Sequence, residues 1–157
     1  MARSRKSFAL YLDTSALIKL FVEEDGSARV RELAGGRAGA EALLSSRLGY
    51  TEAAVTLARL VHLGRLTAGD LVSHLGVLER YWEKSIQEIE LSELVLQDAR
   101  QLAQRHPLRT YDAIHLASAR EAKRLMKDAF DGDVQFLAFD TGLVRAARQE
   151  GFTIPDV

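Results

Sequence analysis

Residues 8–18 of the chain read FALYLDTSALI, and this stretch decides the fold. Its first five residues form a short apolar run that ends at Asp13, which is typical of a buried β-strand. The residues that follow predict a helix over 15–21, with Asp13, Thr14 or Ser15 able to cap its N-terminus. A buried strand that leads directly into a helix is a characteristic beginning of an α/β domain.

The rest of the chain continues this alternation of strands and helices. Short apolar or alternating runs predict further strands over 41–45, 86–91, 134–139 and 152–154. Capping residues and helical spacing predict helices from Ser27 to Gly35-Gly36, from Ser46 to about His62, from Thr67 through Trp82, from Ser92 to just before Pro107, from Thr110 to about Met126, and from Asp140 or Thr141 to Glu150. Strands that alternate with helices indicate a parallel sheet covered on both faces.

Length and composition set further bounds. The 157 residues fit one domain over 1–157, and we expect the basic end, residues 1–7, to be a flexible N-terminus. No cysteine is present, which excludes disulfides, Cys-zinc sites and thiol nucleophiles. A net charge of −1 excludes a uniformly basic coat for nucleic acid, although a local basic patch stays open. No apolar stretch reaches the length of a membrane span, so we expect a cytoplasmic protein.

Four acidic residues stand where this fold would bring them together. Asp13 and Asp140 each follow a buried strand, while Glu52 and Asp112 are predicted in the first turns of helices. Strand ends and helix starts share one edge of such a sheet, and ligand sites form outside that edge. Two carboxylates about 4 Å apart repel by roughly 4 kcal/mol at an effective dielectric of 20. An edge with several of them therefore calls for a cation.

Each acid also has a purely structural interpretation. Asp13 and Asp140 are good helix caps, Asp112 suits a first helical turn, and Glu52 could be a solvated glutamate. The positions of the other candidates are less informative. We interpret all four histidines as surface or half-buried, Trp82 as a core residue or a helix–helix contact, and Arg47 and Arg109 as either phosphate contacts or solvated arginines; the histidines are His62, His74, His106 and His115.

Several classes of enzyme lack their signature in this chain. No GxSxG, HExxH, GxxxxGK[ST] or GxGxxG pattern occurs, which argues against hydrolase triads, zinc proteases and nucleotide cofactors. A phosphorelay receiver would need an acidic pair near the first strand and an aspartate after a middle one. A haloacid-dehalogenase-like phosphatase would need an aspartate at the position of Ser15.

Four local strings resemble the PIN-domain nucleases, specifically the VapC toxins of VapBC toxin–antitoxin systems. They are LDTSAL (12–17), YTE (50–52), LRTYDAIHLA (108–117) and FDTGL (139–143). The string around Asp112 is the most specific and the one around Glu52 the least. The resemblance extends from Leu10 to about Ile154, and all four acidic positions of the family pattern are filled.

The resemblance implies a three-layer α/β/α sandwich with a central parallel sheet. It also implies a metal-dependent endoribonuclease that acts as a toxin, forms a homodimer and is inhibited by a cognate VapB antitoxin. Oxygen ligands suit Mg²⁺ or Mn²⁺. Under this hypothesis Asp13 and Asp112 hold the primary metal, while Glu52 and Asp140 complete its shell, hold a second ion or orient water. Thr14 and Ser15 match the hydroxyl position beside the first aspartate.

Two further points stay open at this level. The alternative function is a PIN-like module that binds RNA or a partner without cutting. Apolar grooves beside the predicted helices 27–34 and 67–82 are candidate antitoxin surfaces, although the same stripes could simply be core. No motif encodes which RNA is recognised, because such choice depends on the shape of pockets and loops.

Overall fold

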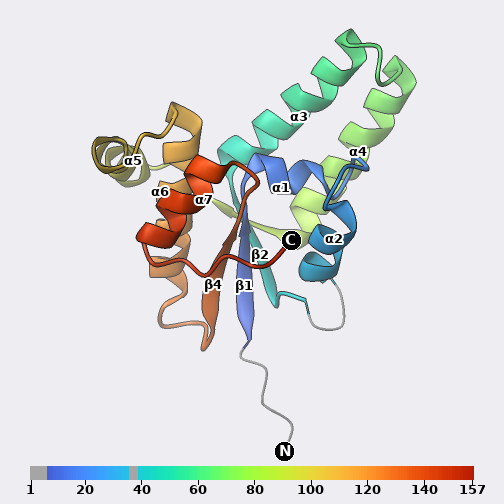
Figure 1. Cartoon of the computed structure of the whole chain (residues 1–157). Coiled ribbons are helices and arrows are strands. Elements are labelled where there is room, and N and C mark those ends of the chain that lie inside the picture. The colour runs from blue at the N-terminus through green and yellow to red at the C-terminus, as the bar shows by residue number, and fades with distance from the viewer. Residues whose placement is uncertain (1–6, 36–38) are drawn as a thin grey trace, which may run out of the picture.

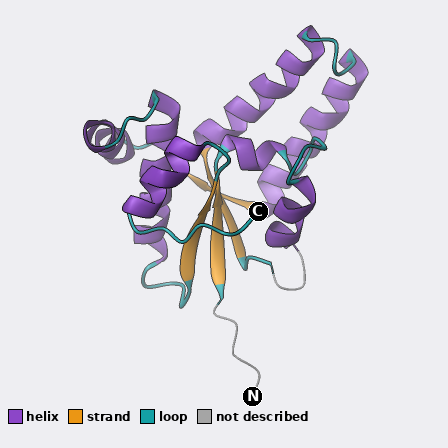
Figure 2. Cartoon of the chain, in the orientation of Figure 1, coloured by secondary structure: helices purple, strands orange, loops and turns teal. Residues whose placement is uncertain are grey.

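A computed structural model describes residues 7–35 and 39–157 (Figure 1). Its centre is a four-stranded, all-parallel sheet in the order β3-β2-β1-β4. The strands are β1 (Phe8–Leu12), β2 (Ala42–Ser46), β3 (Ile86–Ile89) and β4 (Asp133–Leu137). Helices cover both faces of the sheet (Figure 2), which confirms the predicted three-layer α/β/α sandwich.

Seven helices of the described residues surround the sheet. They are α1 (Thr14–Ile18), α2 (Ser27–Gly35), α3 (Arg47–His62), α4 (Ala68–Ser85), α5 (Glu93–Arg105), α6 (Thr110–Met126) and α7 (Thr141–Gln149). The predicted caps are confirmed at five helices, because the side chains of Asp13, Ser46, Thr67, Ser92 and Asp140 each accept a hydrogen bond from a first-turn backbone N–H.

The central strand β1 separates two hydrophobic cores. Ala9 and Tyr11 point to the face covered by α5, α6 and α7, whereas Leu10 and Leu12 point to the face covered by α1 to α4. All four residues are fully buried. A strand buried on both faces reads as a continuous apolar run, which is why residues 8–12 carry no alternation.

Helices α3 and α4 form a hairpin that extends beyond the sheet (Figure 1). Near the sheet, Leu78 and Trp82 are buried, and Trp82 packs edge-on against Tyr50 at 5.2 Å between ring centroids. The core interpretation of Trp82 is therefore confirmed. Towards the tip, Val72 is 73% exposed. In the described part of the chain no helix is long and apolar enough to cross a membrane.

Some predicted elements differ in the structure. The strand predicted over 152–154 is absent; this segment contributes one ladder-like bond, from the N–H of Phe136 to the carbonyl of Thr153, at 3.0 Å. Thr110 is the first residue of α6 rather than its cap, since Arg109 holds the cap position without a side-chain bond. Ser27 likewise lies inside α2, and its hydroxyl donates to the carbonyl of Val22.

Other boundaries move by a few residues. Helix α1 stops at Ile18 and continues as turns, so the prediction to residue 21 was too long. Strand β3 ends at Ile89, two residues before the predicted end. The flexible end predicted for residues 1–7 lies almost wholly outside the described residues, as does Gly36.

Candidate active site

Asp13 stands at the carboxyl end of β1, where the sheet holds it firmly. Its backbone N–H donates to the carbonyl of Leu137 at 3.1 Å, which ties the ends of β1 and β4 together. The carboxylate is 5% exposed and accepts two bonds on the same oxygen, Oδ1, from the N–H of Ala16 at 2.9 Å and the hydroxyl of Ser15 at 2.7 Å. The second oxygen, Oδ2, accepts no hydrogen bond within the described residues.

Ser15 connects this aspartate to the next strand. Its hydroxyl donates to Asp13 and accepts the backbone N–H of Phe139 at 3.0 Å. The residue after Phe139 is Asp140, which caps α7 by accepting the N–H of Leu143 at 2.8 Å. One hydroxyl thus fixes the segment that follows β4 beside the aspartate that follows β1.

Glu52 reaches the same edge from α3. The helix begins at Arg47, so Glu52 lies in its second turn and the prediction of a first-turn position was wrong. One oxygen, Oε2, accepts the hydroxyl of Thr14 at 2.5 Å and lies 2.7 Å from Nε2 of His115. Burial by itself raises the pKa of Glu52, but the hydrogen bonds from His115 and Thr14 outweigh it and bring the pKa below its ordinary value.

His115 is a site residue that the sequence interpretation missed. It is 2% exposed, and its Nδ1 lies 3.0 Å from the hydroxyl of Tyr11 beneath the sheet edge. The expectation of surface or half-buried histidines is therefore wrong here, and it is also wrong for His106, which is 8% exposed. The available signal was the spacing of Asp112 and His115, because residues three apart share one helix face.

Gly49 makes room for this arrangement. It lies in the first turn of α3, where a Cβ atom would stand 2.7 Å from the hydroxyl of Ser45 and 3.4 Å from the ring of His115. Since Ser45 is itself tied to the carbonyl of Leu12, the neighbouring backbone has little freedom to yield. A glycine at this position lets α3 approach the sheet closely enough for Glu52 to meet His115.

The charges of neighbouring acids affect the pKa of Asp112. Burial raises its pKa above the ordinary value, the charges of Asp140 and Glu52 add to that rise, and the charge of Arg109 opposes it. Burial likewise raises the pKa of Asp13, and the charge of Asp112 contributes. The four acids from α1, α3, α6 and α7 are therefore electrostatically coupled, as their positions in the sequence predicted.

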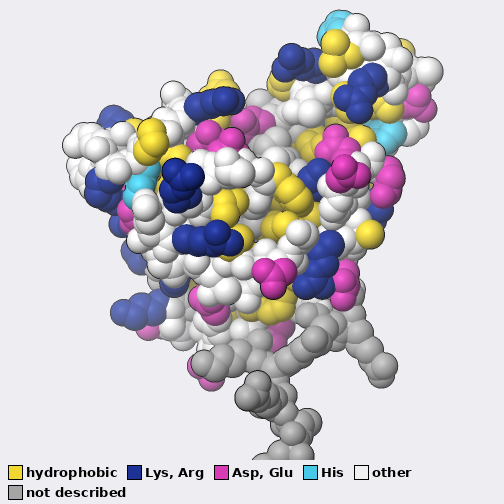
Figure 3. Space-filling model, in the orientation of Figure 1, with side chains coloured by type: hydrophobic (Ala, Val, Ile, Leu, Met, Phe, Trp, Pro, Cys, Tyr) yellow, Lys and Arg dark blue, Asp and Glu magenta, His cyan; other side chains and the backbone are white. Residues whose placement is uncertain are grey.

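The acids form a cluster rather than a finished coordination sphere. Among the described residues, no three acidic or histidine side chains already surround one ion position. The donor set nevertheless fits a divalent cation, because it consists of carboxylate oxygens; burial raises the pKa of Asp13 and Asp112, and the charges of neighbouring acids add to the rise. Acidic side chains gather at the upper edge of the surface seen in Figure 3, close to the start of α7.

The two arginines near the acids differ. The guanidinium of Arg47 pairs with Glu88 at 2.7 Å, which directs it away from the acids. Arg109 is exposed and lies close enough to Asp112 to lower its pKa. Of the two candidate phosphate contacts, Arg109 is the one that the structure leaves beside the acids.

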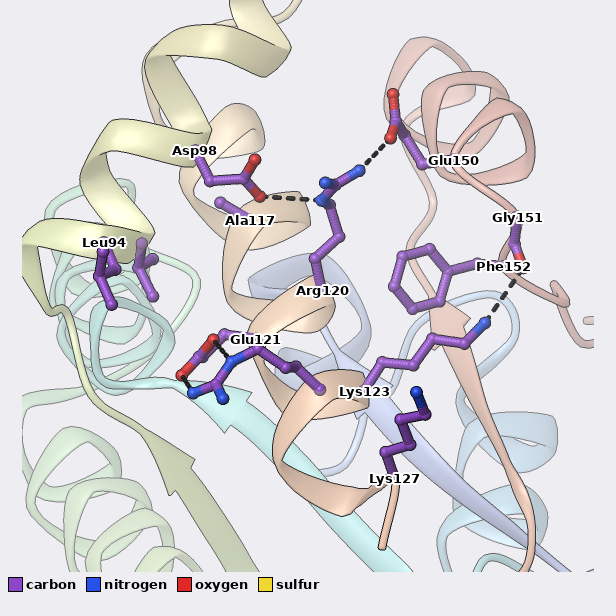
Figure 4. A pocket seen from close by; sticks show the side chains of 12 residues that line it. Leu94, Asp98, Ala117, Arg120, Glu121, Lys123, Lys127, Glu150, Gly151 and Phe152 are labelled. Atoms are coloured by element: carbon purple, nitrogen blue, oxygen red, sulfur yellow. Dashed lines mark hydrogen bonds and ion pairs between the residues drawn. The ribbon is translucent and has the colours of Figure 1, made fainter.

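One pocket lies elsewhere, between α5, α6 and the segment after α7 (Figure 4). Arg120 crosses it and pairs with Asp98 at 2.9 Å and with Glu150, while Lys123 donates to the carbonyl of Gly151 at 3.3 Å. These bonds join three parts of the chain. Most of its charged groups pair with one another, so this pocket is a structural junction rather than part of the acidic site.

The fold and the acidic edge define the class of this protein, and comparison with known proteins agrees. A sequence model of the PIN domain matches residues 10–149, so the chain belongs to the PIN domain family. Within it, the chain is 39% identical over 110 residues to ribonuclease VapC49 of Mycobacterium tuberculosis (strain ATCC 25618 / H37Rv), covering 70% of this chain and 74% of that relative.

Two further comparisons cover almost the full length. Ribonuclease VapC47 of Mycobacterium tuberculosis (strain CDC 1551 / Oshkosh) is 29% identical over 144 residues, which is 91% of this chain and 93% of that relative. The crystal structure of Mycobacterium tuberculosis VapC20, described as a sarcin-ricin loop cleaving toxin, superposes with a TM-score of 0.64 at 17% identity over 92% of this chain and 96% of that one. The chain is thus a VapC-type member of the PIN domain family.

Proposed function

We propose that this protein is a Mg²⁺- or Mn²⁺-dependent endoribonuclease that hydrolyses RNA phosphodiester bonds as the toxin of a toxin–antitoxin pair. The observation that carries the proposal is the gathering of four acids at one sheet edge, where burial raises the pKa of Asp13 and Asp112 and the charges of neighbouring acids add to the rise. The ribonuclease names of the VapC relatives support the substrate class.

The acids divide into two pairs in this proposal. Asp13 and Asp112 would hold the primary ion, and Oδ2 of Asp13 is the free oxygen for it, because Ser15 and the α1 backbone occupy Oδ1. Glu52 and Asp140 would complete the shell or hold a second ion. A bound divalent ion supplies a lowered pKa for attacking water and offsets charge on the phosphoryl oxygens.

The other residues act by holding these carboxylates in place. Ser15 positions Asp13, and Thr14 with His115 positions Glu52. Groups that orient the ligands of a metal commonly change its affinity or the activity by about 10–100-fold when they are removed. Arg109, exposed beside Asp112, is positioned to meet a phosphate of the RNA strand.

A nuclease assay tests the chemistry directly. Purified protein is incubated with total RNA and with Mg²⁺, with Mn²⁺, or with EDTA. We expect cleavage with either ion and none with EDTA. Cleavage that persists in EDTA would contradict metal dependence, and RNA binding without cleavage under every condition would favour the alternative, a PIN-like binding module. Mapping the cleaved ends after induction in cells would identify the RNA.

We further propose that the chain forms a single PIN domain and a homodimer, acts in the cytoplasm and is neutralised by a VapB-type antitoxin. The α4 face remains a proposed antitoxin surface, which the 73% exposure of Val72 supports, whereas the apolar stripe of α2 with Val30 and Leu33 is buried in the core. Co-purification with the product of a small neighbouring reading frame tests the partner. Light scattering of the free protein tests the dimer.

A further inference from the structure

A buried chain of hydrogen bonds leads from the core to Glu52. Tyr11 is fully buried in β1, and its ring stacks on Phe136 at 5.4 Å between centroids. Its hydroxyl lies 3.0 Å from Nδ1 of His115, whose other nitrogen, Nε2, lies 2.7 Å from Oε2 of Glu52. The path therefore connects the interior of the α5–α7 face with the acidic edge.

We propose that Tyr11 and His115 are positioning residues for Glu52, with the Tyr11 hydroxyl selecting the histidine tautomer that donates to the carboxylate. In this arrangement the Tyr11 O–H donates to Nδ1, which leaves the proton of the neutral ring on Nε2. The Nε2–H then donates to Glu52. The inference rests on the proposed function, since it names how one of the proposed site acids is held.

The hydroxyl proton of Tyr11 fixes the direction of the chain. A tyrosine hydroxyl is protonated at neutral pH, and that of Tyr11 lies on a fully buried residue. Nδ1 of His115 lies 3.0 Å from this hydroxyl, and the buried hydroxyl of Ser118 is its other polar side-chain neighbour. A buried donor without a partner is disfavoured, and an unprotonated Nδ1 gives the Tyr11 O–H an acceptor at 3.0 Å.

With the opposite tautomer, Nε2 could no longer donate to Glu52 and could only accept the hydroxyl of Thr14, which lies 3.1 Å away. A lone pair on Nε2 would then face the lone pairs of a carboxylate oxygen only 2.7 Å away. With the proton on Nε2, that nitrogen and the hydroxyl of Thr14 both donate to Oε2. The other oxygen, Oε1, receives no bond from either and stays available at the acidic edge.

The substitution Tyr11→Phe tests the tautomer selection without opening the core. Phenylalanine keeps the ring that stacks on Phe136 but removes the donor to His115. We expect the turnover number for RNA to fall by about 10–100-fold with little change in KM, and the midpoint of Mg²⁺ binding to rise within the same range. The matched control is Tyr81→Phe, because Tyr81 is half-buried, packs on Phe21 and is distant in the sequence from Tyr11 and His115.

A double-mutant cycle separates positioning from a general loss of stability. In protein that already carries Glu52→Gln, the additional change Tyr11→Phe should leave turnover and Mg²⁺ binding almost unaltered, because no carboxylate remains to be aligned. His115→Gln, whose amide N–H can still donate toward residue 52, should retain more activity than His115→Ala. A Tyr11→Phe effect that is equal with and without Glu52 would overturn the proposal.

Nitrogen NMR of ¹⁵N-histidine-labelled protein gives a readout that needs no nuclease activity. We expect the His115 ring to be neutral with its proton on Nε2 in the wild type, and to become a mixture of tautomers in Tyr11→Phe. A proton on Nδ1 or a doubly protonated ring in the wild type would overturn the proposal. If the protein cleaved no RNA, the proposed function would fail while this measurement still decided how Glu52 is held.

Discussion

Two buried histidine–glutamate pairs occur in this molecule, and they differ in what surrounds them. His115 meets Glu52 and His106 meets Glu150, each with 2.7 Å between Nε2 and a carboxylate oxygen. In both pairs the glutamate pKa lies below its ordinary value, because hydrogen bonds outweigh the effect of burial. By contact distance and direction of pKa shift alone, the two pairs are alike.

The difference is in the remaining charge. Glu150 also accepts hydrogen bonds from Arg105 and Arg120, so cations surround it. Glu52 receives only Thr14 and His115 among the described residues, and its charge raises the pKa of Asp112. A carboxylate neutralised by arginines holds the fold together, whereas a carboxylate that adds to its neighbours' repulsion favours binding of a cation. The contrast distinguishes a structural junction from a candidate active site.

The largest expected effect is that of Asp112→Asn on RNA cleavage. We expect RNA cleavage to fall by more than about 100-fold, beyond the 10–100-fold typical of residues that only orient a ligand. The melting temperature in EDTA should stay equal or rise, because the substitution removes a charge that Asp140 and Glu52 repel. Cleavage kinetics and thermal melting of the same preparation measure both. A variant that cuts RNA at the wild-type rate would contradict the assignment of Asp112.

Mg²⁺ should stabilise the protein by binding near the His115–Glu52 pair and not near the His106–Glu150 pair. An ion that binds the native state at 100 times its Kd adds about 2.7 kcal/mol to the free energy of unfolding. We expect the melting temperature of the wild type and of Glu150→Gln to rise with Mg²⁺, and that of Asp112→Asn to rise little. Equal shifts in all three proteins would place the ion away from the acidic edge.

Glu150→Gln should have the reverse effect of Asp112→Asn. Loss of a charged acceptor shared by His106, Arg105 and Arg120 should lower the free energy of unfolding by about 1–3 kcal/mol, with cleavage per folded molecule unchanged. Urea unfolding measures the loss. Glu32→Gln is the control, since its exposed pair with Arg29 should contribute at most about 1 kcal/mol. A loss of cleavage per folded molecule in Glu150→Gln would show that the surroundings of Glu150 also contribute to activity, and would contradict a purely structural role.

The smallest expected effect is in the pH dependence of stability without metal. The pKa of Asp112 is raised in the native state, so the native protein binds more protons and stability falls as the pH rises through that pKa. The pKa of Glu150 is lowered, so its stabilising contribution is lost as the pH falls through that value.

Urea unfolding in EDTA across acidic to neutral pH checks both signs. Asp112→Asn should reduce the decrease in the free energy of unfolding as the pH rises through the pKa of Asp112. Glu150→Gln should reduce the decrease in the free energy of unfolding as the pH falls through the pKa of Glu150. If both substitutions reduced the loss of stability in the same direction of pH change, the electrostatic contrast between the two regions would be wrong.

The sequence predicted much of the site because its signals are local. Asp13 and Asp140 follow apolar strands, and both cap the next helix as their positions indicated. The strand predicted over 152–154 failed for a tertiary reason, since an apolar segment beside β4 was buried without a full ladder of hydrogen bonds. Glu52 was placed one turn too early although the predicted helix start at Ser46 nearly matches the start of α3 at Arg47, so the error lay in the turn assigned to Glu52 and not in the boundary of the helix.

By itself, the sequence determined the order of strands and helices, the parallel sheet and the edge at which the acids gather. These follow from apolar runs, capping residues and the rule that parallel strands end on one side. Only the tertiary structure decided which histidine matters and which glutamate is neutralised. His115 and His106 each meet a glutamate that is distant in the sequence, and their roles differ because folding brings arginines to Glu150 and carboxylates to Glu52. Charge acts through space, and the distances that set it exist only after the chain has folded.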